Sequence, residues 1–599
     1  MDHKPLLNRL APPSLAGQPS RLLARVAISR GARTPDDVEA FLAPLPSIPN
    51  LLAAAQHEEV LSIARRIQHA VRGNETIVIF ADYDADGATS AVILYDFLTA
   101  LGAAPAIFLP HRINEGYGLT STAAIRCVRE HHPDLLIAVD CGTNSTDAID
   151  LLRSEYHCDT IVIDHHSPLD LERHPGLFLN PKLSPSSPES ARELSAAGLT
   201  FLLVDAILPT APSARSFDRD RAIILAGIGT FVDVMPLTAI NRTLVKNALT
   251  LLNTASGRDR IPGIAAVLEE ASSPDVDSWT LAFLLGPILN ASGRIDDAMR
   301  TIALLTACER SAVIPLATAC VATNETRKQI QRDILAEAEI DATALLEKCP
   351  TTPILVVARA HWHTGIVGIV AARLRERFHR PAIVLGALED ATGCHWKGSA
   401  RSINGYDIGT AITNAVNSGY AIAGGGHKMA GGIAVPFAGL ERLRQHLNEN
   451  CGLTDADLAP RFDVLPGSPQ MVERDWAFLF ESLEPFGSGN ARPCVEFNDV
   501  RIRRPLIHLR KPTAPGKHSL GAIYSILVDV VTPEGHVIRA QSYDVKLIER
   551  LTAADSPLRI LLGLRRQPSK ITRNTRDPRL KPVVSYRWFI ESITPTDPS

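Results

Sequence analysis

Residues 77–90, IVIFADYDADGATS, join a short apolar run to three aspartates at alternate positions and then a glycine. The pattern D-x-D-x-D-G is also the first half of a calcium-binding EF-hand loop. Such a loop starting at Asp82 needs a bidentate Glu at its twelfth position, where this chain has Ile93. It also needs a helix in front, whereas TIVIF is short and β-branched. The stretch therefore predicts a strand that delivers acidic side chains at its C-terminal end.

Length and composition indicate a multidomain globular protein. The 599 residues are too many for one core, and 45% hydrophobic with 21% charged residues is ordinary for a soluble chain. Nine cysteines without a C-x-x-C pair favour reduced thiols over disulfides or a thiolate zinc site. The first residues, MDHKPLLNRLAPPSL, lack an apolar signal core, and Asp233 stops the apolar run 222–232 well short of a membrane span. We expect a cytoplasmic protein with no membrane segment.

The net charge of −4 hides an asymmetry along the chain. From Arg501 onward there are 18 Lys and Arg against 8 Asp and Glu, whereas the first five hundred residues carry 43 against 57. An acidic body with a basic C-terminal part suggests metal chemistry in the first and polyanion binding in the second.

Hydrophobic patterning divides the chain into parts. From about residue 59, helical segments alternate with the near-continuously apolar strands TIVIF, AIFLP, LLIAVD, TIVIDHH and GLFLN, which predicts a parallel, doubly wound α/β sheet. A long polar helix and a second α/β region follow, and after residue 460 short strands separated by turn signals predict a small β-barrel or sandwich. The expected parts are a helical lead-in (1–58), an α/β domain with a helical region (59–320), a connector helix (321–348), a second α/β domain (349–455) and a β-domain (456–599).

Four apolar segments of the first α/β domain, each of which we expect to be a strand, end in metal-binding residue types. The residues are Asp82, Asp84 and Asp86 after TIVIF, Asp140 after LLIAV, Asp164, His165 and His166 after TIVI, and Asp233 after AGIGTFV. A single aspartate at a strand end is usually a helix cap or turn residue, but four such ends are hard to explain by turns alone. Carboxyl ends of parallel strands line one crevice, and clustered carboxylates repel one another unless cations neutralise them. Carboxylates with imidazole and no thiolate suit two Mn²⁺ or Mg²⁺ ions better than zinc.

The same residues carry a family resemblance. DYDADG, VDCG, IDHH and GIGTFVDVMPL resemble the motifs of the DHH phosphoesterases, and HRINEGYGLT and LNASGRIDDA are similar to those of the RecJ-type single-strand-specific DNA exonucleases. The resemblance implies two Mn²⁺ or Mg²⁺ ions on Asp84, Asp86, Asp140, His165 and Asp233, with Asp140 as the bridge. It leaves Asp82 to bind metal or to orient its neighbours, places His166 beside the scissile phosphate, and gives Asp164 a role in orienting a histidine.

Later motifs supply candidate phosphate-binding residues. LLGPILNASGRIDDA places Asn290 and Arg294 after an apolar helix, and arginine is the usual fork for a phosphate. The second α/β region resembles the DHHA1 domain, which accompanies DHH domains and grips the substrate strand. Its candidate residues are Ser399, Arg401, Gly425, Gly426 and His427. The connector helix would set the width of a cleft that admits one strand but not two. The last part resembles an OB-fold, whose basic groove suits single-stranded nucleic acid. Tyr524, Tyr543, Tyr586 and Trp588 are available there to stack on bases, and the basic stretch 564–581 is expected to form a loop on the DNA path.

Together these expectations describe a metal-dependent exonuclease that degrades single-stranded DNA in repair and recombination and releases mononucleotides. The 5′-to-3′ direction, a single-stranded-DNA-binding protein and a helicase as partners follow from the resemblance only. Two alternatives stay open. One is a DHH phosphodiesterase acting on short oligonucleotides or cyclic dinucleotides, against which the basic β-domain counts. The other is a non-catalytic replication scaffold, against which the complete acidic set counts.

Overall fold

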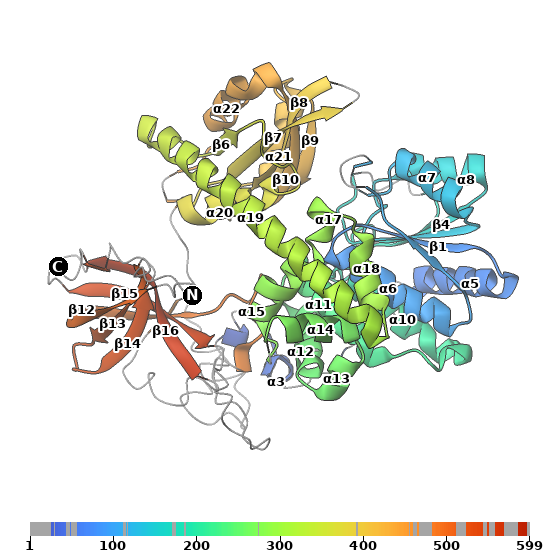
Figure 1. Cartoon of the computed structure of the whole chain (residues 1–599), viewed down its shortest axis with the longest axis horizontal. Helices are drawn as coiled ribbons and strands as arrows, with labels where there is room; N and C mark the ends of the chain where they lie inside the picture. The colour runs from blue at the N-terminus through green and yellow to red at the C-terminus, as the bar shows by residue number, and fades with distance from the viewer. Residues whose placement is uncertain are drawn as a thin grey trace. The chain divides into compact units, whose positions relative to one another are not determined.

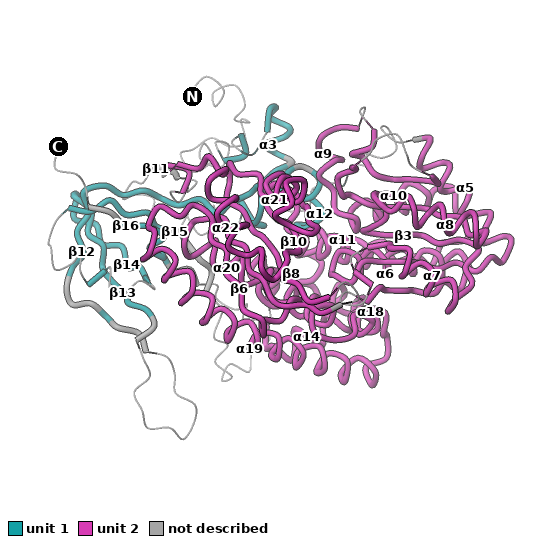
Figure 2. The backbone as a smooth tube through the Cα atoms, turned by 90° about the horizontal axis from the view of Figure 1, so that it is seen from above, with its two compact units in different colours: residues 1–48, 236–246, 462–599 teal, residues 49–235, 247–461 magenta. Residues whose placement is uncertain are grey.

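The computed structural model describes most of the chain beyond residue 25. Described are residues 26–42 (except 29 and 31), 48, 57–454 (except 112–114, 117, 170–174, 185–186, 274 and 391–392), 456–458, 464–466, 482–510, 523–542, 548–549, 557–567 and 585–595. The chain forms two compact units (Figure 2), one of residues 1–48, 236–246 and 462–599 and one of residues 49–235 and 247–461. We describe each unit by itself, beginning with the larger.

The first sheet of the larger unit has five parallel strands in the order β2-β1-β3-β4-β5. The strands are β1 (Ile77–Ala81), β2 (Ala106–Phe108), β3 (Leu135–Val139), β4 (Asp159–Ile163) and β5 (Leu177–Leu179). The order reverses between β1 and β3, so the carboxyl ends of these two strands flank the crevice where doubly wound sheets bind ligands. The expected parallel α/β sheet is confirmed.

Helices cover both faces of this sheet because its strands are buried on both sides. Val78 and Phe80 of β1 share a core with α7 (Ser121–His131) and α8 (Thr146–Tyr156), which Figure 1 shows together on one face. Three helices, α5 (His57–Gly73), α6 (Ala85–Ala100) and α10 (Ala196–Ile207), also pack on strands of the sheet.

The segment that ends at Asp233 is a helix, α11 (Arg219–Val232), so the strand expected there is wrong. A continuous apolar run does not distinguish a buried strand from a buried helix by its periodicity. Here every residue from Ala222 to Phe231 is buried, because α11 packs against both α6 and α10. Asp218 caps the helix by accepting from the backbone N–H of Arg221. Asp233 therefore enters the site from a helix C-terminus.

A helical region follows and leads into the long connector. Its helices are α9 (Glu189–Arg192), which precedes α10, then α12 (Ala239–Leu252), α13 (Ala255–Asp259), α14 (Pro262–Glu270), α15 (Ser278–Thr280), the π-helical turn η4 (Leu281–Leu285), α16 (Gly286–Leu289), α17 (Ser292–Ile295), α18 (Met299–Thr306) and α19 (Arg310–Lys348). The connector α19 has 39 residues and begins at Arg310 rather than at residue 321. Pro315 makes the segment before 321 look like a break, but it lies in the second turn and removes only one backbone hydrogen bond.

The second α/β region has a mixed sheet in the order β6-β7-β8-β10-β9. Its strands are β6 (Leu355–Ala358), β7 (Ala382–Asp390), β8 (Gly393–Arg401), β9 (Ala423–His427) and β10 (Ala430–Pro436), and its helices are α20 (Val367–Phe378), α21 (Ile408–Asn417) and α22 (Leu440–Glu449). Only β6 and β7 pair in parallel. The glycine-rich stretch forms β9, which pairs with β10 at the edge of the sheet.

The smaller unit contains a closed barrel. Its strands are β11 (Val464–Pro466), β12 (Cys494–Arg510), β13 (Ile523–Val531), β14 (Val537–Ser542), β15 (Leu558–Gln567) and β16 (Ser585–Pro595). The ring runs β12-β13-β14-β16-β15 and closes by pairing of β15 with β12, while β14 and β16 are parallel. Five strands in this arrangement confirm the expected OB-like barrel. Trp588, an expected stacking residue, lies in the barrel core. Of the basic stretch 564–581, expected to form a loop on the DNA path, residues 564–567 belong to β15 and the rest lies outside the described residues.

The beginning of α12 belongs to the smaller unit and carries a buried cation. Arg242 is 2% exposed, and its guanidinium lies 3.8 Å from the ring centroid of Phe41 in α3 (Pro35–Leu42). It donates to the carbonyl oxygens of Phe41 and of residues 482–484. Burial lowers the pKa of Arg242 to about 10. This one side chain therefore ties together segments of the smaller unit that are far apart in the sequence.

Among the residues described, none of the helices is both long enough and apolar enough to cross a membrane.

Candidate metal centre and phosphate-binding residues

The aspartate-rich loop after β1 folds around the start of α6. Asp84 caps the helix, and its Oδ1 accepts from the backbone N–H groups of Asp86 at 2.9 Å and Gly87 at 3.2 Å. A Cβ added to Gly87 would lie 2.3 Å from the carbonyl oxygen of Asp82, so a side chain there would push the loop open. The spacing D-x-D-x-D-G is thus what allows the three carboxylates to share one tight turn.

Asp86 lies against the N-terminus of α10. Its two carboxylate oxygens accept from the backbone N–H groups of Ala196 at 2.8 Å and Ala197 at 3.0 Å. A Cβ added to Gly229 of α11 would lie 2.7 Å from Asp86 Oδ1 and 2.4 Å from Thr89 Oγ1. The close approach of α11 to α6 at this glycine places Asp233, one turn further along, beside the aspartate-rich loop.

Two strand ends supply the next carboxylates. Asp140 follows β3 with φ of +60°, in the left-handed region that aspartate tolerates better than most residues, and it is 3% exposed. Asp164 follows β4 and accepts from the backbone N–H groups of Thr143 at 3.0 Å and His165 at 2.7 Å. The Nδ1 of His166 donates to Asp164 Oδ1 at 2.7 Å. Asp164 thus orients the imidazole of His166.

All the sequence-predicted metal ligands converge. Ligand atoms within 4.8 Å of one another form three overlapping groups: Asp82, Asp84 and Asp140; Asp86, His165 and Asp233; and Asp140, Asp164, His165 and His166. His165 Nε2 is central to them. It lies 3.3 Å from Asp140 Oδ1, 3.5 Å from Asp233 Oδ2 and 4.0 Å from Asp86 Oδ2.

The donor set fits divalent cations. Within the part of the chain that the structure describes, Asp140 Oδ1 and both ring nitrogens of His165 are buried without a hydrogen-bond partner. Burial, followed by the charges of neighbouring aspartates, raises the pKa of Asp86 to about 7 and the pKa values of Asp140 and Asp233 well above the usual range. Carboxylates this close cannot all ionise in the protein alone, whereas bound cations would neutralise them and satisfy the orphaned atoms.

The neighbouring imidazoles differ in charge. Burial would lower the pKa of His166, but the charge and hydrogen bond of Asp164 outweigh burial and raise it to about 9. The same pair lowers the pKa of Asp164 despite its burial. Burial, and next the His166 cation, lower the pKa of His427, whose ring centroid lies 6.0 Å from that of His166. A cationic and a neutral imidazole therefore face each other beside the acidic cluster.

The residues of LNASGRIDDA touch both domains. Asn290 Oδ1 accepts from the backbone N–H of Ala85 at 2.8 Å, so this side chain holds the aspartate-rich loop in place. Arg294 Nη1 donates to the carbonyl oxygen of Gly365, at 3.4 Å, in the loop before α20.

The candidate residues of the second domain lie on neighbouring strands. Arg401 Nη1 donates to Ser399 Oγ at 2.8 Å, and Ser399 pairs in register with Gly432 of β10. Gly425 and Gly426 lie in β9, and a Cβ added to Gly425 would have no atom within 4 Å. The structure thus brings His427 to His166 and joins Ser399 to Arg401, while Gly425 borders open space.

Two residues near His165 and His166 were missed from the sequence. Lys182 Nζ donates to the carbonyl oxygen of His165, and burial lowers the pKa of Lys182. Asn180 Nδ2 donates to the carbonyl oxygen of His166 at 2.9 Å and to Thr143 Oγ1 at 2.8 Å. Both follow β5, which supplies no acidic ligand. The one feature of the sequence that could have pointed to them is their position just after a strand that pairs with β4.

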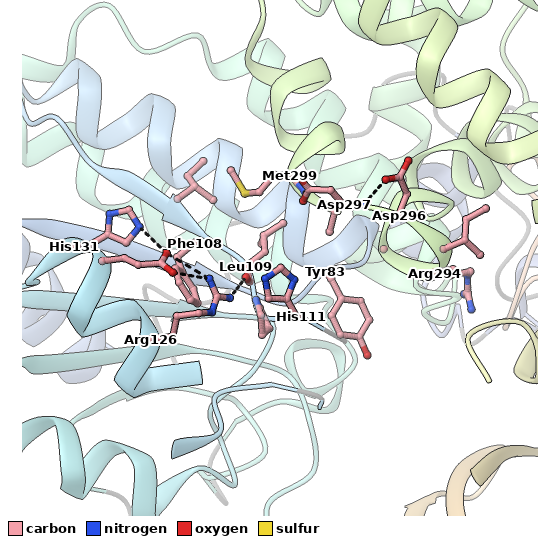
Figure 3. Close-up of a pocket in the computed structure, with 16 residues that line it drawn as sticks. Tyr83, Phe108, Leu109, His111, Arg126, His131, Arg294, Asp296, Asp297 and Met299 are labelled. Carbon is pink, nitrogen blue, oxygen red and sulfur yellow. Dashed lines mark hydrogen bonds and ion pairs between the residues drawn. The ribbon is translucent and has the colours of Figure 1, made fainter. Parts of the chain in front are cut away.

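A cavity of about 510 Å³ adjoins the aspartate-rich loop (Figure 3). Tyr83 and Arg294 lie toward one end, and Phe108 and Met299 give it apolar walls. Arg126 also lines it, but its guanidinium is occupied by Glu115, Glu130 and the carbonyl oxygen of Leu109. The cavity is thus a recess with both apolar and charged walls, and Tyr83 of the aspartate-rich loop forms part of its lining.

Comparison with known proteins agrees with this site. Residues 76–227 match the DHH family, N-terminal domain, and residues 351–452 match the DHHA1 domain. The chain is 32% identical to the single-stranded-DNA-specific exonuclease RecJ of Escherichia coli over 517 residues, which are 82% of this chain and 86% of that protein. It is 31% identical to RecJ of Bacillus subtilis over 487 residues, which cover 79% of this chain and 58% of that protein.

Solved structures show the same fold. RecJ of Thermus thermophilus in complex with Mn²⁺ aligns with a TM-score of 0.70 at 23% identity, covering 96% of this chain and 76% of that one. An exonuclease RecJ bound to manganese aligns with a TM-score of 0.53 at 28% identity, covering 68% and 95%. With a converged acidic cluster, both domain matches and this identity to E. coli RecJ, the chain belongs to the RecJ family of DHH-domain exonucleases.

Proposed function

We propose that this chain is a metal-dependent exonuclease that hydrolyses phosphodiester bonds of single-stranded DNA and releases mononucleotides. The observation that carries the proposal is the convergence on His165 of aspartates from three separate segments, the buried Asp86 and Asp140 and the partly exposed Asp233, in a chain 32% identical to a single-stranded-DNA-specific exonuclease. The 5′-to-3′ direction, and a role in DNA repair and recombination, are part of the proposal.

The metal-binding residues would be Asp82, Asp84, Asp86, Asp140, His165 and Asp233, holding two Mn²⁺ or Mg²⁺ ions. When bound, such ions lower the pKa of a water and stabilise charge on the oxygens of the phosphate under attack. Asp140, whose Oδ1 is orphaned, belongs both to the group that contains Asp84 and to a group that contains His165, so its carboxylate would suit a bridge between two ions.

The remaining polar residues would bind and orient the substrate. Asp164 keeps His166 protonated, so that its imidazolium can donate to a phosphate oxygen as negative charge develops. Asn290 holds the aspartate-rich loop, and Arg294 lies at the contact with the second domain. In the second domain, Ser399, Arg401, Gly425, Gly426 and His427 would contact the backbone of the strand.

A discriminating assay compares nucleotide release from a long single strand, a duplex and a dinucleotide in Mn²⁺. We expect release from the long single strand. Cleavage of the dinucleotide alone would favour a phosphodiesterase for short oligonucleotides or cyclic dinucleotides, although the OB-like barrel suits a longer strand. Equal release by the wild type and Asp140→Ala would contradict the metal mechanism, and no release by the wild type would favour a replication scaffold.

Partners and location complete the proposal. Single-stranded DNA is the expected substrate, a single-stranded-DNA-binding protein and a helicase are the expected protein partners, and the cytoplasm is the expected location. Co-purification of the tagged chain with either protein from nuclease-treated extract, which removes DNA bridges, tests the partners.

A further inference from the structure

Residues 361–368, HWHTGIVG, lie between two sets of candidate phosphate-binding residues, and we call them the bridging segment. At Gly365 the segment meets Arg294. A Cβ added to Gly365 would lie 2.4 Å from the carbonyl oxygen of Arg294, and Arg294 Nη1 donates to the carbonyl oxygen of Gly365 at 3.4 Å. The two backbones are therefore in direct contact, with no room for a side chain between them.

The other end of the bridging segment lies next to Ser399 and Arg401 of the second domain. A Cβ added to Gly368 would lie 3.0 Å from Ser399 Oγ and 3.3 Å from Arg401 Nη2. Arg294 comes from the helical region after the DHH match, whereas Ser399 and Arg401 come from the DHHA1 domain. The backbone of the bridging segment thus fixes the spacing between Arg294 on one side and Ser399 and Arg401 on the other.

Trp362 anchors the bridging segment. Its ring is 1% exposed and shares a core with Ile334 and Ala338 of α19, against which Ile295, the neighbour of Arg294, also packs. A Cβ added to Gly386 of β7 would lie 2.1 Å from the carbonyl oxygen of Trp362. The segment is therefore clamped between the connector helix and the sheet of the second domain.

Glu337 of α19 holds the indole of Trp362. Its Oε2 accepts from Trp362 Nε1 at 2.8 Å and lies 2.8 Å from His361 Nε2. One turn further along α19, Asp341 accepts two bonds of 2.9 Å from Arg359, just before the segment. The connector helix thus presents two carboxylates to the start of the bridging segment, and only Glu337 bonds to the buried indole.

We propose that Glu337 is a positioning residue that fixes the bridging segment through Trp362 and so aligns Arg294 with Ser399 and Arg401 to grip one DNA strand. This inference rests on the proposed nuclease function. Because the acidic cluster is built from other elements, loss of Glu337 weakens DNA binding and leaves the chemical step intact.

The experiment measures kcat and KM for Mn²⁺-dependent release from a single-stranded oligonucleotide by the full chain. The variants are Glu337→Leu, Trp362→Phe, the double variant and the conservative Glu337→Gln. Glu339→Ala is the matched control, because Glu339 also joins α19 to the second domain, through Arg377 of α20, without touching Trp362.

We expect Glu337→Leu and Trp362→Phe each to raise KM about ten-fold while kcat stays within about two-fold, since the lost bond is a charge-assisted one. The double variant should match Glu337→Leu, because that variant already lacks the hydrogen bond to the indole, together with the contacts of Glu337 with His361 and Arg359. Glu337→Gln keeps an acceptor and should restore KM to within about two-fold of the wild type, and Glu339→Ala should leave it unchanged.

Three results would overturn the inference. They are an unchanged KM in Glu337→Leu, a fall in kcat of Glu337→Leu instead of a rise in its KM, or a rise in the KM of Glu339→Ala as large as that of Glu337→Leu. If Trp362→Phe does not fold, the contrast between Glu337→Leu and Glu337→Gln decides. An inactive wild type would instead overturn the proposed nuclease function, so the two failures are distinguishable.

Discussion

The acidic cluster and the β9–β10 hairpin both adjoin His166, yet they are built in opposite ways. The cluster is enclosed, with Asp140 3% and His165 7% exposed, and Gly229 leaves no room beside it. Strand β9 is largely exposed, and Gly425 has nothing near it. An enclosed site holds its groups in one arrangement before the substrate arrives, whereas an exposed edge strand can adjust to a moving DNA backbone. Changes in the cluster should therefore alter kcat and stability, and changes in the hairpin should alter KM.

Removing one buried charge from the cluster should have the largest effect. In Asp140→Asn we expect Mn²⁺-dependent activity to fall on the order of 10³-fold, because the orphaned carboxylate oxygen is lost. In EDTA the same variant should melt about 2–4 °C higher than the wild type, because the raised pKa of Asp140 makes folding cost free energy that a neutral asparagine does not cost. Thermal melts with and without Mn²⁺ test this. Asp150→Asn, in an exposed pair with Arg153, is the control, and a lower melting temperature in EDTA would contradict the account.

Gly229→Ala should come next. The added Cβ would lie 2.4 Å from Thr89 Oγ1 and 2.7 Å from Asp86 Oδ1, so α11 must move away from α6 and take Asp233 with it. Because a misplacement of about 1 Å can cost about 10²-fold, we expect a loss of that order together with a lower melting temperature. Nucleotide release and thermal melts are the measurements, and full activity in this variant would mean that Asp233 does not need its present position.

Arg401→Lys should affect binding more than chemistry. Lysine cannot reproduce the guanidinium that bonds Ser399 Oγ and the carbonyl oxygen of Ala400, nor the two-pronged contact that a guanidinium can make with a phosphate. We expect KM for single-stranded DNA to rise about ten-fold with kcat within about two-fold. Arg373→Lys, at an exposed pair with Glu376, should leave both unchanged. A fall in kcat without a rise in KM would mean that Arg401 acts in the chemical step, like the acidic cluster, and not in DNA binding.

The charge on His166 gives a pH-dependent stability. Its folded pKa of about 9 lies above the unfolded value near 6.5, so its contribution is fully present below pH 6.5 and is lost as pH rises through 9. In EDTA, denaturant unfolding of the wild type and His166→Gln should differ more at pH 6 than at pH 9.5, by on the order of 2–3 kcal/mol. His427→Gln should show no such loss at high pH, because its pKa is lowered. A difference that grows with pH would contradict the His166–Asp164 pairing.

Gly425→Ala should give the smallest effect. The added methyl group meets no protein atom, so the melting temperature should match the wild type to within about 1 °C. If DNA approaches this strand closely, KM should still rise about two- to three-fold, because the methyl group keeps the backbone N–H groups away from phosphate. A filter-binding titration checks this, and unchanged affinity would remove Gly425 from the DNA path.

The sequence was most informative where an apolar strand ends in charged residues. Asp82, Asp140 and Asp164 follow β1, β3 and β4, and adjacent parallel strands must bring their ends together. Asp233 was placed correctly for the wrong reason, since a helix brings it there. A wholly buried run carries no periodicity to separate the two structures.

What the sequence could not supply are contacts made by tertiary packing. Lys182 donates to the backbone carbonyl oxygen of His165, and Glu337 accepts from the indole of Trp362. Neither residue lies in a sequence pattern that predicts its partner. Glycines were informative only as turn signals, whereas the structure shows that Gly229 and Gly365 are points of contact between elements.

The burial of Arg242 has a consequence for the order in which the protein forms. Translation reaches residue 461, the last of the larger unit, before it reaches the carbonyl groups of residues 482–484 that receive the guanidinium. Domains generally fold as units during synthesis, and contacts between distant residues form slowly. On the ribosome, the larger unit should therefore fold while the guanidinium of Arg242 is still in contact with water. The smaller unit needs both residues 26–42 and residues beyond 482. Its folding should therefore be the late and slow step.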